Sequence, residues 1–130
     1  MSREPTRLED YLPVPQAALN ILLALLEGEA HGHGIKKSIE ARTSGRLRMR
    51  AGTLYEALHR LDRDGFIDEV QTPSDCQQAT SRWRYYRITA LGRAVLKAEL
   101  ERLDAIVRYA AQRDLRLDPG VSRQAAKTRS

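Results

Sequence analysis

The chain has 130 residues, which is enough for one domain with extensions but too few for two independent hydrophobic cores. Lys and Arg outnumber Asp and Glu by 22 to 17, and the net charge of +5 predicts attraction to polyanions such as nucleic acid or an acidic lipid surface. The longest apolar run, 17–26, is far shorter than a bilayer span of about 20 residues, so no transmembrane helix is expected. Cys76 is the only cysteine, which excludes an intrachain disulfide.

The first 13 residues mix charges with prolines and show no sustained periodicity, so we expect a flexible N-terminal arm over 1–13. The acidic residues in this arm do not fit the basic start and unbroken apolar middle of a secretory signal. A cytoplasmic location is therefore expected.

A first helix should begin near Pro15 and end at Glu27-Gly28, because proline suits the first turn of a helix and 17–26 is apolar on almost all sides. In a soluble protein such a helix is buried between other elements or against a second subunit. The residues predicted to contribute to a dimer interface here are Leu19, Leu22 and Leu23.

A second helix is expected at about 34–42, because Ile35 and Ile39 share a face and charged residues lie opposite. His31 and His33 precede it in a glycine-containing turn. Two histidines without a neighbouring carboxylate or thiolate are too few ligands for zinc, so we interpret them as turn and helix-start residues and predict no metal site.

Residues 46–65 carry the most informative pattern of the chain. Apolar residues recur at the spacing of one helical face and predict a core-facing stripe made of Leu54, Ala57, Leu58 and Leu61. Polar and basic side chains occupy the opposite face, and Gly65 ends the helix. Three arginines alternate directly before the helix, at 46, 48 and 50. The pattern predicts a third helix that lies against phosphate through its outward face.

Two short strands are expected next, at 66–70 and 83–89, because both segments are rich in aromatic and β-branched residues. They should form a hairpin around the polar segment 71–82, which is too long for a tight turn and would extend outward like a wing. Tyr85 and Tyr86 point to opposite faces of the second strand. One of them should enter the core, and the sequence leaves open which one.

The order of three helices and a hairpin predicts a mainly α fold with a small β-hairpin, a winged helix-turn-helix DNA-binding domain over 14–89. A final helix should follow, whose apolar residues repeat with the 4,3,4,3 spacing of a short coiled coil. We expect a dimerisation helix over 90–115 and a disordered tail over 116–130. The predicted seam consists of Leu96, Leu100, Leu103, Val107 and Ala110.

Basic residues before and on the third helix, together with those of the second strand, form the candidate DNA-binding set. Arginines that pair with phosphate set the salt dependence of binding, whereas side chains in the groove discriminate sequence. The candidates are Arg48, Arg50, Gly52, Thr53, Tyr55, His59, Arg60, Arg63, Arg82 and Arg84. Glu56 lies on the same face and would either accept from a cytosine amine or pair with Arg60 one turn later.

No glycine-rich phosphate loop, nucleophile elbow or paired acidic residues indicate catalysis, so we predict no enzyme and no cofactor. The expected partners are a double-stranded DNA operator, a second copy of the chain and, as an open alternative, a small-molecule effector. A protein-interaction adaptor that uses the winged helix without specific DNA binding is the alternative function, since fold does not fix function.

Four segments together resemble the PadR family of transcriptional regulators, namely HGHGI (31–35), GTLYEALHRL (52–61), DGFI (64–67) and RYYRITALG (84–92). The resemblance extends over roughly 15–113. It implies a homodimeric winged helix protein of the compact subgroup that binds inverted-repeat operators, usually as a repressor, and is often released by a small molecule. By position, Thr53 and Tyr55 match the helix start that contacts the DNA backbone in this family. Arg50-Ala51 stand where many members carry serine-proline, which removes the usual helix cap.

Overall fold

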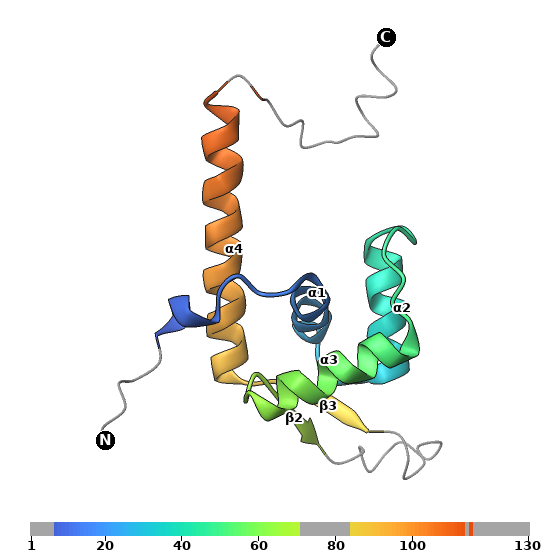
Figure 1. Cartoon of the computed structure of the whole chain (residues 1–130). Helices are drawn as coiled ribbons and strands as arrows, with labels where there is room; N and C mark the ends of the chain where they lie inside the picture. Colours follow the sequence, from blue (N-terminus) through green and yellow to red (C-terminus); the bar gives the residue numbers. More distant parts are fainter. Residues whose placement is uncertain (1–6, 71–83, 114, 116–130) are drawn as a thin grey trace, which may run out of the picture. The chain divides into compact units, whose positions relative to one another are not determined.

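The computed structural model describes residues 7–70, 84–113 and 115. The chain divides into two compact units, 1–98 and 99–130, whose boundary lies within the last helix. The elements in chain order (Figure 1) are η1 (Leu8–Tyr11), α1 (Gln16–Leu25), β1 (Ala30–His31), α2 (Gly32–Arg42), α3 (Ala51–Arg63), β2 (Ile67–Val70), β3 (Tyr85–Ile88) and α4 (Ala90–Ala111). This mostly helical architecture with one small sheet confirms the predicted fold class. Across the described residues, none of the helices combines the length and apolar character needed to cross a membrane.

The sheet is antiparallel, with the order β1-β3-β2. Its β2–β3 hairpin confirms the two strands expected from the sequence, with Ile67 opposite Ile88 and Val70 opposite Tyr85. The short strand β1 was not predicted. It pairs Ala30 with Tyr86, so the segment leading into α2 is fixed to the same sheet as the hairpin.

The hydrophobic core of the first unit is built from the inward faces of α1, α2, α3 and the sheet, together with Val95 and Leu96 of α4. The stripe expected on α3 is confirmed, because Leu54, Leu58 and Leu61 are buried and Ala57 packs against the core. Tyr86 is buried and Tyr85 is only half-buried, which answers the question that the sequence left open.

Two residues of the predicted dimer interface belong instead to this core. Leu22 is fully buried and Leu96 is 2% exposed within a single chain, so their side chains have no surface left for a second subunit. The almost entirely apolar α1 is thus explained by burial within the chain. Leu19 and Leu23 are half-buried and pack against the same core.

Part of the predicted flexible arm is folded. Residues 8–11 form η1, and the Tyr11 ring packs edge-on against Phe66 with centroids 5.0 Å apart. The expectation of a flexible arm is therefore wrong for residues 8–11, because the contact between Tyr11 and Phe66 anchors this turn to the core. The turn is too short to show an apolar periodicity in the sequence. Residues 1–6 of the arm, the wing segment 71–82 and the tail 116–130 lie outside the described residues, as do Cys76 and Arg82.

Asn20 is a buried polar residue in the apolar helix α1, and it joins α1 to α2. Its side-chain Nδ2 donates to the carbonyl oxygen of Gln16 at 2.8 Å, and its Oδ1 accepts from Nη2 of Arg42 at 2.7 Å. Asn20 is only 6% exposed, so water cannot readily take the place of Arg42 as the hydrogen-bond donor to its Oδ1. The pair therefore fixes the C-terminal end of α2 against the first turns of α1.

Substituting Arg42→Ala should lower the free energy of unfolding by about 1–3 kcal/mol, because the Asn20 oxygen is left buried without its donor. Urea denaturation of the purified protein measures this change. The same substitution in an Asn20→Leu background should cost much less, since no acceptor remains to be satisfied. Arg46→Ala, a change at an exposed arginine of the following turn, is the control and should have an effect below about 0.5 kcal/mol. Equal losses in both backgrounds would contradict the pairing argument.

The part of α4 in the second unit exposes apolar side chains on one seam. Leu100 is 39% and Val107 is 43% exposed, while Leu103 and Ala110 on the same seam are half-buried. The flanks are charged: Arg102 donates to both carboxylate oxygens of Glu99 at 2.8 Å, and Arg108 pairs with Asp104 at the same distance. Hydrogen bonding to Glu99 raises the pKa of the Arg102 guanidinium above its ordinary value, so this side chain stays charged.

Candidate nucleic-acid interface

The outward face of α3 is held at the surface by the leucines beneath it. With Leu54, Leu58 and Leu61 buried, the helix geometry turns Gly52, Thr53, Tyr55, Glu56, His59, Arg60 and Arg63 outward, and all seven are exposed. The helix begins after Arg50, whose side chain makes no capping hydrogen bond. The first backbone N–H groups of α3 therefore receive no hydrogen bond from the side chain of the preceding residue. This agrees with the loss of the usual helix cap expected from Arg50-Ala51.

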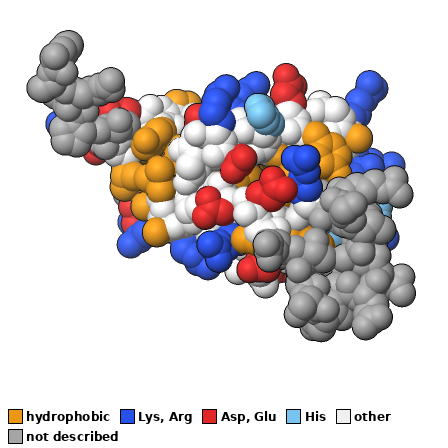
Figure 2. Space-filling model, turned by 90° about the horizontal axis from the view of Figure 1, so that it is seen from below, with side chains coloured by type: hydrophobic (Ala, Val, Ile, Leu, Met, Phe, Trp, Pro, Cys, Tyr) orange, Lys and Arg blue, Asp and Glu red, His pale blue; other side chains and the backbone are white. Residues whose placement is uncertain are grey.

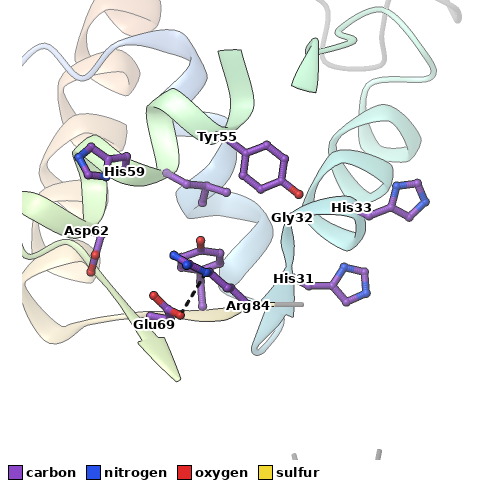
Figure 3. A pocket seen from close by; sticks show the side chains of 10 residues that line it. His31, Gly32, His33, Tyr55, His59, Asp62, Glu69 and Arg84 are labelled. Carbon is purple, nitrogen blue, oxygen red and sulfur yellow. Dashed lines mark ion pairs between the residues drawn. The ribbon is translucent and has the colours of Figure 1, made fainter. Parts of the chain in front are cut away.

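A pocket of about 640 Å³ opens between α3, the start of α2 and the hairpin (Figure 3). It brings together residues far apart in the sequence. Tyr55 and His59 come from α3, Arg84 precedes β3, and His31 and His33 flank the first residue of α2. The remaining lining residues are Gly32, Leu58, Asp62, Glu69 and Tyr86.

Gly32 is the point at which α2 and α3 approach each other. A methyl group built on Gly32 would meet the Tyr55 hydroxyl oxygen at 2.5 Å and the ring at 2.8 Å. Any larger residue would displace the tyrosine ring, which lies over the glycine in Figure 3. Glycine at this position thus sets where the half-exposed Tyr55 presents its hydroxyl.

His31 fixes the beginning of α2. Its Nδ1 accepts from the N–H of Gly34 at 3.0 Å and so caps the helix, while its ring contacts Tyr85 edge-on at 5.2 Å. The His33 ring stacks against the ring of His31, with centroids 6.3 Å apart. The interpretation of these histidines as turn and helix-start residues is confirmed for His31. Within the described ranges, no group of three or more His, Cys, Asp or Glu side chains is arranged to hold a metal ion.

The arginines of the hairpin are paired with acidic residues across the two strands. Arg84 lies 3.7 Å from a carboxylate oxygen of Glu69, and Arg87 lies 3.7 Å from one of Asp68. All four side chains are more than 40% exposed, so these ion pairs contribute little to stability and the arginines can exchange their carboxylate partners for other anions. Figure 2 shows the result on the face that carries α3 and the hairpin, with acidic side chains near the middle and basic ones around them.

Tyr86 is a buried residue among those that line the pocket. Burial raises the pKa of the Tyr86 phenol above its ordinary value, and the nearby Glu69 carboxylate acts in the same direction against the opposing effect of Arg84. The phenol therefore remains a neutral hydrogen-bonding group at physiological pH.

Of the candidate DNA-binding residues, Tyr55, His59 and Arg84 line this pocket. Arg60 instead lines a separate cavity of about 180 Å³, beside Tyr11 and Phe66. Arg63 pairs with the adjacent Asp64 at 3.4 Å, and Arg48 and Arg50 are exposed in the segment before α3. Glu56 and Arg60 form no ion pair in the part of the chain that the structure describes, so of the two roles considered for Glu56 the pairing with Arg60 is not seen.

Sequence reasoning missed four polar or charged contributors to the pocket, namely His31, His33, Asp62 and Glu69. The two histidines were noticed as a motif, but only the pairing of β1 with β3 shows that they approach the hairpin. The two acidic residues carry no local signal of their own, because Asp62 lies in a charged helix and Glu69 reaches Arg84 only through the pairing of the two strands.

Comparison with known proteins agrees with this architecture. Residues 21–98 match the model of the Transcriptional regulator PadR-like family. The chain is 32% identical over 90 residues to Transcriptional regulator Rv3488 of Mycobacterium tuberculosis, a match that covers 69% of this chain and 78% of the relative. A transcriptional regulator from Clostridium thermocellum superposes with a TM-score of 0.63 at 28% identity, covering 74% of this chain and 87% of the other.

A more distant likeness is Bacillus subtilis PadR, solved in complex with operator DNA. It is 23% identical, with a TM-score of 0.57, and the match covers 68% of this chain and 48% of that one. At this identity the likeness concerns the fold alone. The family is one of transcription regulators without enzymatic activity, which agrees with the expectation that the chain is not an enzyme. The family match over 21–98 and the similarity to Rv3488 confirm the resemblance found in the four sequence segments: the chain belongs to the Transcriptional regulator PadR-like family.

Proposed function

We propose that the chain is a homodimeric, sequence-specific DNA-binding repressor that acts on an inverted-repeat operator in the cytoplasm. In this arrangement α3 enters the major groove and the hairpin lies along the flanking backbone. The observation that carries the proposal is the convergence of Tyr55 and His59 on α3 with Arg84 beside β3 in one open pocket. A single duplex approaching this face touches both elements at once.

Each candidate residue has a role that follows from its position. Arg48 and Arg50 precede the uncapped start of α3, where basic side chains and free backbone N–H groups favour phosphate. Gly52 has no atom within 4 Å of an added methyl group, so the helix start offers room for close backbone approach. His59 and Arg63 occupy the outward face at the spacing of one turn and are the candidates for base contacts.

Two observations support the remaining parts of the proposal. The exposed seam of α4 around Leu100 and Val107 favours association with a second copy, which an inverted repeat requires. The solved operator complex of Bacillus subtilis PadR supports duplex DNA as the partner. Release by a small molecule rests on the family resemblance, and a compound that weakens operator binding while raising thermal stability would identify it.

Charge reversal tests the contact surface. Arg63→Glu and Arg84→Glu should each weaken operator binding by about tenfold to a hundredfold near 0.1 M salt, because attraction to a phosphate is replaced by repulsion. The slope of log K against log salt should fall by about 0.9 for each phosphate that the protein no longer neutralises. Fluorescence anisotropy on the DNA upstream of the gene, over several salt concentrations, measures both quantities.

Arg108→Glu applies the same change of charge to α4 and serves as the control, with affinity expected to stay within a factor of about two. If both test variants fold and keep the affinity and salt slope of the original protein, the proposed surface is wrong. Weak, sequence-independent binding that appears only at low salt would instead favour the adaptor function.

A further inference from the structure

Gly32 is the first residue of α2 and is buried against the side chain of Tyr55. Its backbone conformation does not require glycine, because the described glycines with positive φ are Gly28, Gly45 and Gly65. Alanine is also the better residue within a helix. The reason for glycine at this position therefore lies in what a Cβ atom would contact.

The atoms closest to such a Cβ all belong to one side chain. They are the hydroxyl oxygen, Cζ and Cε1 of Tyr55, at 2.5, 2.8 and 2.9 Å. Atoms that are not bonded to each other do not approach this closely, so alanine at position 32 would force the ring to move. Figure 3 shows the ring extending from α3 toward Gly32.

This displacement should cost the fold little and should change the position of the hydroxyl. Tyr55 is 51% exposed, so its ring can turn further into solvent while Leu54 and Leu58 stay buried beneath α3. None of the three nearest atoms belongs to the main chain. The nearest of all is the hydroxyl oxygen, so the polar end of the side chain is the part that moves.

The Tyr55 hydroxyl is available to a phosphate of DNA. Over the residues that the structure describes, no hydrogen bond joins it to another group. Tyr55 lines the open pocket between α3, the start of α2 and the hairpin. A phenolic O–H donates to a phosphate oxygen at about 2.7 Å, and the bond weakens steeply when the donor is out of line. Its strength therefore depends on where the ring is held.

We propose that Gly32 is a positioning residue for DNA binding: its missing side chain leaves the space from which the Tyr55 hydroxyl donates to a backbone phosphate. The start of α2 thereby controls a contact that α3 makes. The inference rests on the proposed function, because it requires a duplex on this face. A phosphate contact carries no sequence information, so its loss should weaken binding to the operator and to an unrelated duplex by the same factor.

The test compares Gly32→Ala with Tyr55→Phe, which keeps the ring and removes the hydroxyl. Each should weaken operator binding by about fivefold to twentyfold near 0.1 M salt, measured by fluorescence anisotropy. The double variant should bind within a factor of about two of Tyr55→Phe alone, because no hydroxyl remains to be misplaced. The melting temperature of Gly32→Ala should stay within about 4 °C of the original protein, since only an exposed ring moves.

Gly34→Ala is the matched control. It adds a methyl group to the same turn of α2, where the nearest atom is on His31 at 3.5 Å, an ordinary contact. Its operator affinity should stay within a factor of about two of the original protein.

Four results would overturn the inference while leaving operator binding by the original protein intact. Gly32→Ala could bind as tightly as the original protein, or it could lose the same factor again in the Tyr55→Phe background. Its melting temperature could fall further than expected, which would show that more than the ring had moved. Tyr55→Phe could keep full affinity, which would show that the hydroxyl makes no contact. Failure of the original protein to bind any duplex would instead contradict the proposed function itself.

Discussion

In the homodimer proposed above, replacing Leu100 and Val107 together with aspartate should separate the two subunits and weaken operator binding by at least about a hundredfold. The two side chains lie seven residues apart on α4 and remain 39% and 43% exposed in the single chain. Carboxylates at these positions would have to lose their hydration when two seams meet. A monomer contacts one half-site only, so the gain from binding two linked half-sites disappears.

Sedimentation velocity and operator anisotropy measure the two effects on the same preparation. Ala105→Asp with Gln112→Asp is the matched control, because it adds the same charge at the same spacing on the opposite face, where both residues are exposed. The control should remain dimeric and keep its affinity within a factor of about three. A double variant that is still a dimer, or an original protein that sediments as a monomer, would show that this seam does not join subunits.

The elements with strong periodicity were predictable, whereas pairings that depend on distant segments were not. The stripe of Leu54, Leu58 and Leu61 identified α3 because apolar spacing encodes one helical face. The two-residue strand β1 has no period to detect, and its pairing of Ala30 with Tyr86 exists only because the hairpin is already in place.

The error at Leu96 has the same origin. A 4,3,4,3 spacing shows that one face of a helix is apolar, but it does not show whether a neighbouring element of the same chain or a second subunit covers that face. In this protein the answer changes along α4, since Leu96 is buried in the core and Leu100 is exposed.

The candidate site was predictable in its positive charges and not in its negative ones. Arg84 was identified from a local cluster of arginines, while its partner Glu69 lies on the other strand and is found only from the register of the hairpin. Charge along a sequence therefore identifies a face, and pairing across the fold determines how much of that charge is available to DNA.

The turn between β3 and α4 depends on a glycine that the local pattern does not single out. The Thr89 hydroxyl donates to the carbonyl oxygen of Gly65 at 2.7 Å and accepts from the N–H of Gly92 at 3.0 Å, while the backbone N–H of Thr89 donates to the carbonyl oxygen of Phe66 at 3.0 Å. These bonds hold the first turn of α4 directly against the end of α3. Gly92 is consequently buried in backbone contact with Phe66.

Gly92→Ala should therefore lower the free energy of unfolding by about 2–4 kcal/mol. The added methyl group would overlap the carbonyl oxygen of Phe66 and lie 2.9 Å from Ile88, and a backbone oxygen cannot turn aside as a side chain can. Gly52→Ala is the matched control, because its methyl group meets no atom within 4 Å and alanine in a helix should stabilise folding by up to about 1 kcal/mol. Urea denaturation of both variants distinguishes the two sites, and similar stabilities for both would contradict the close packing of α4 against Phe66.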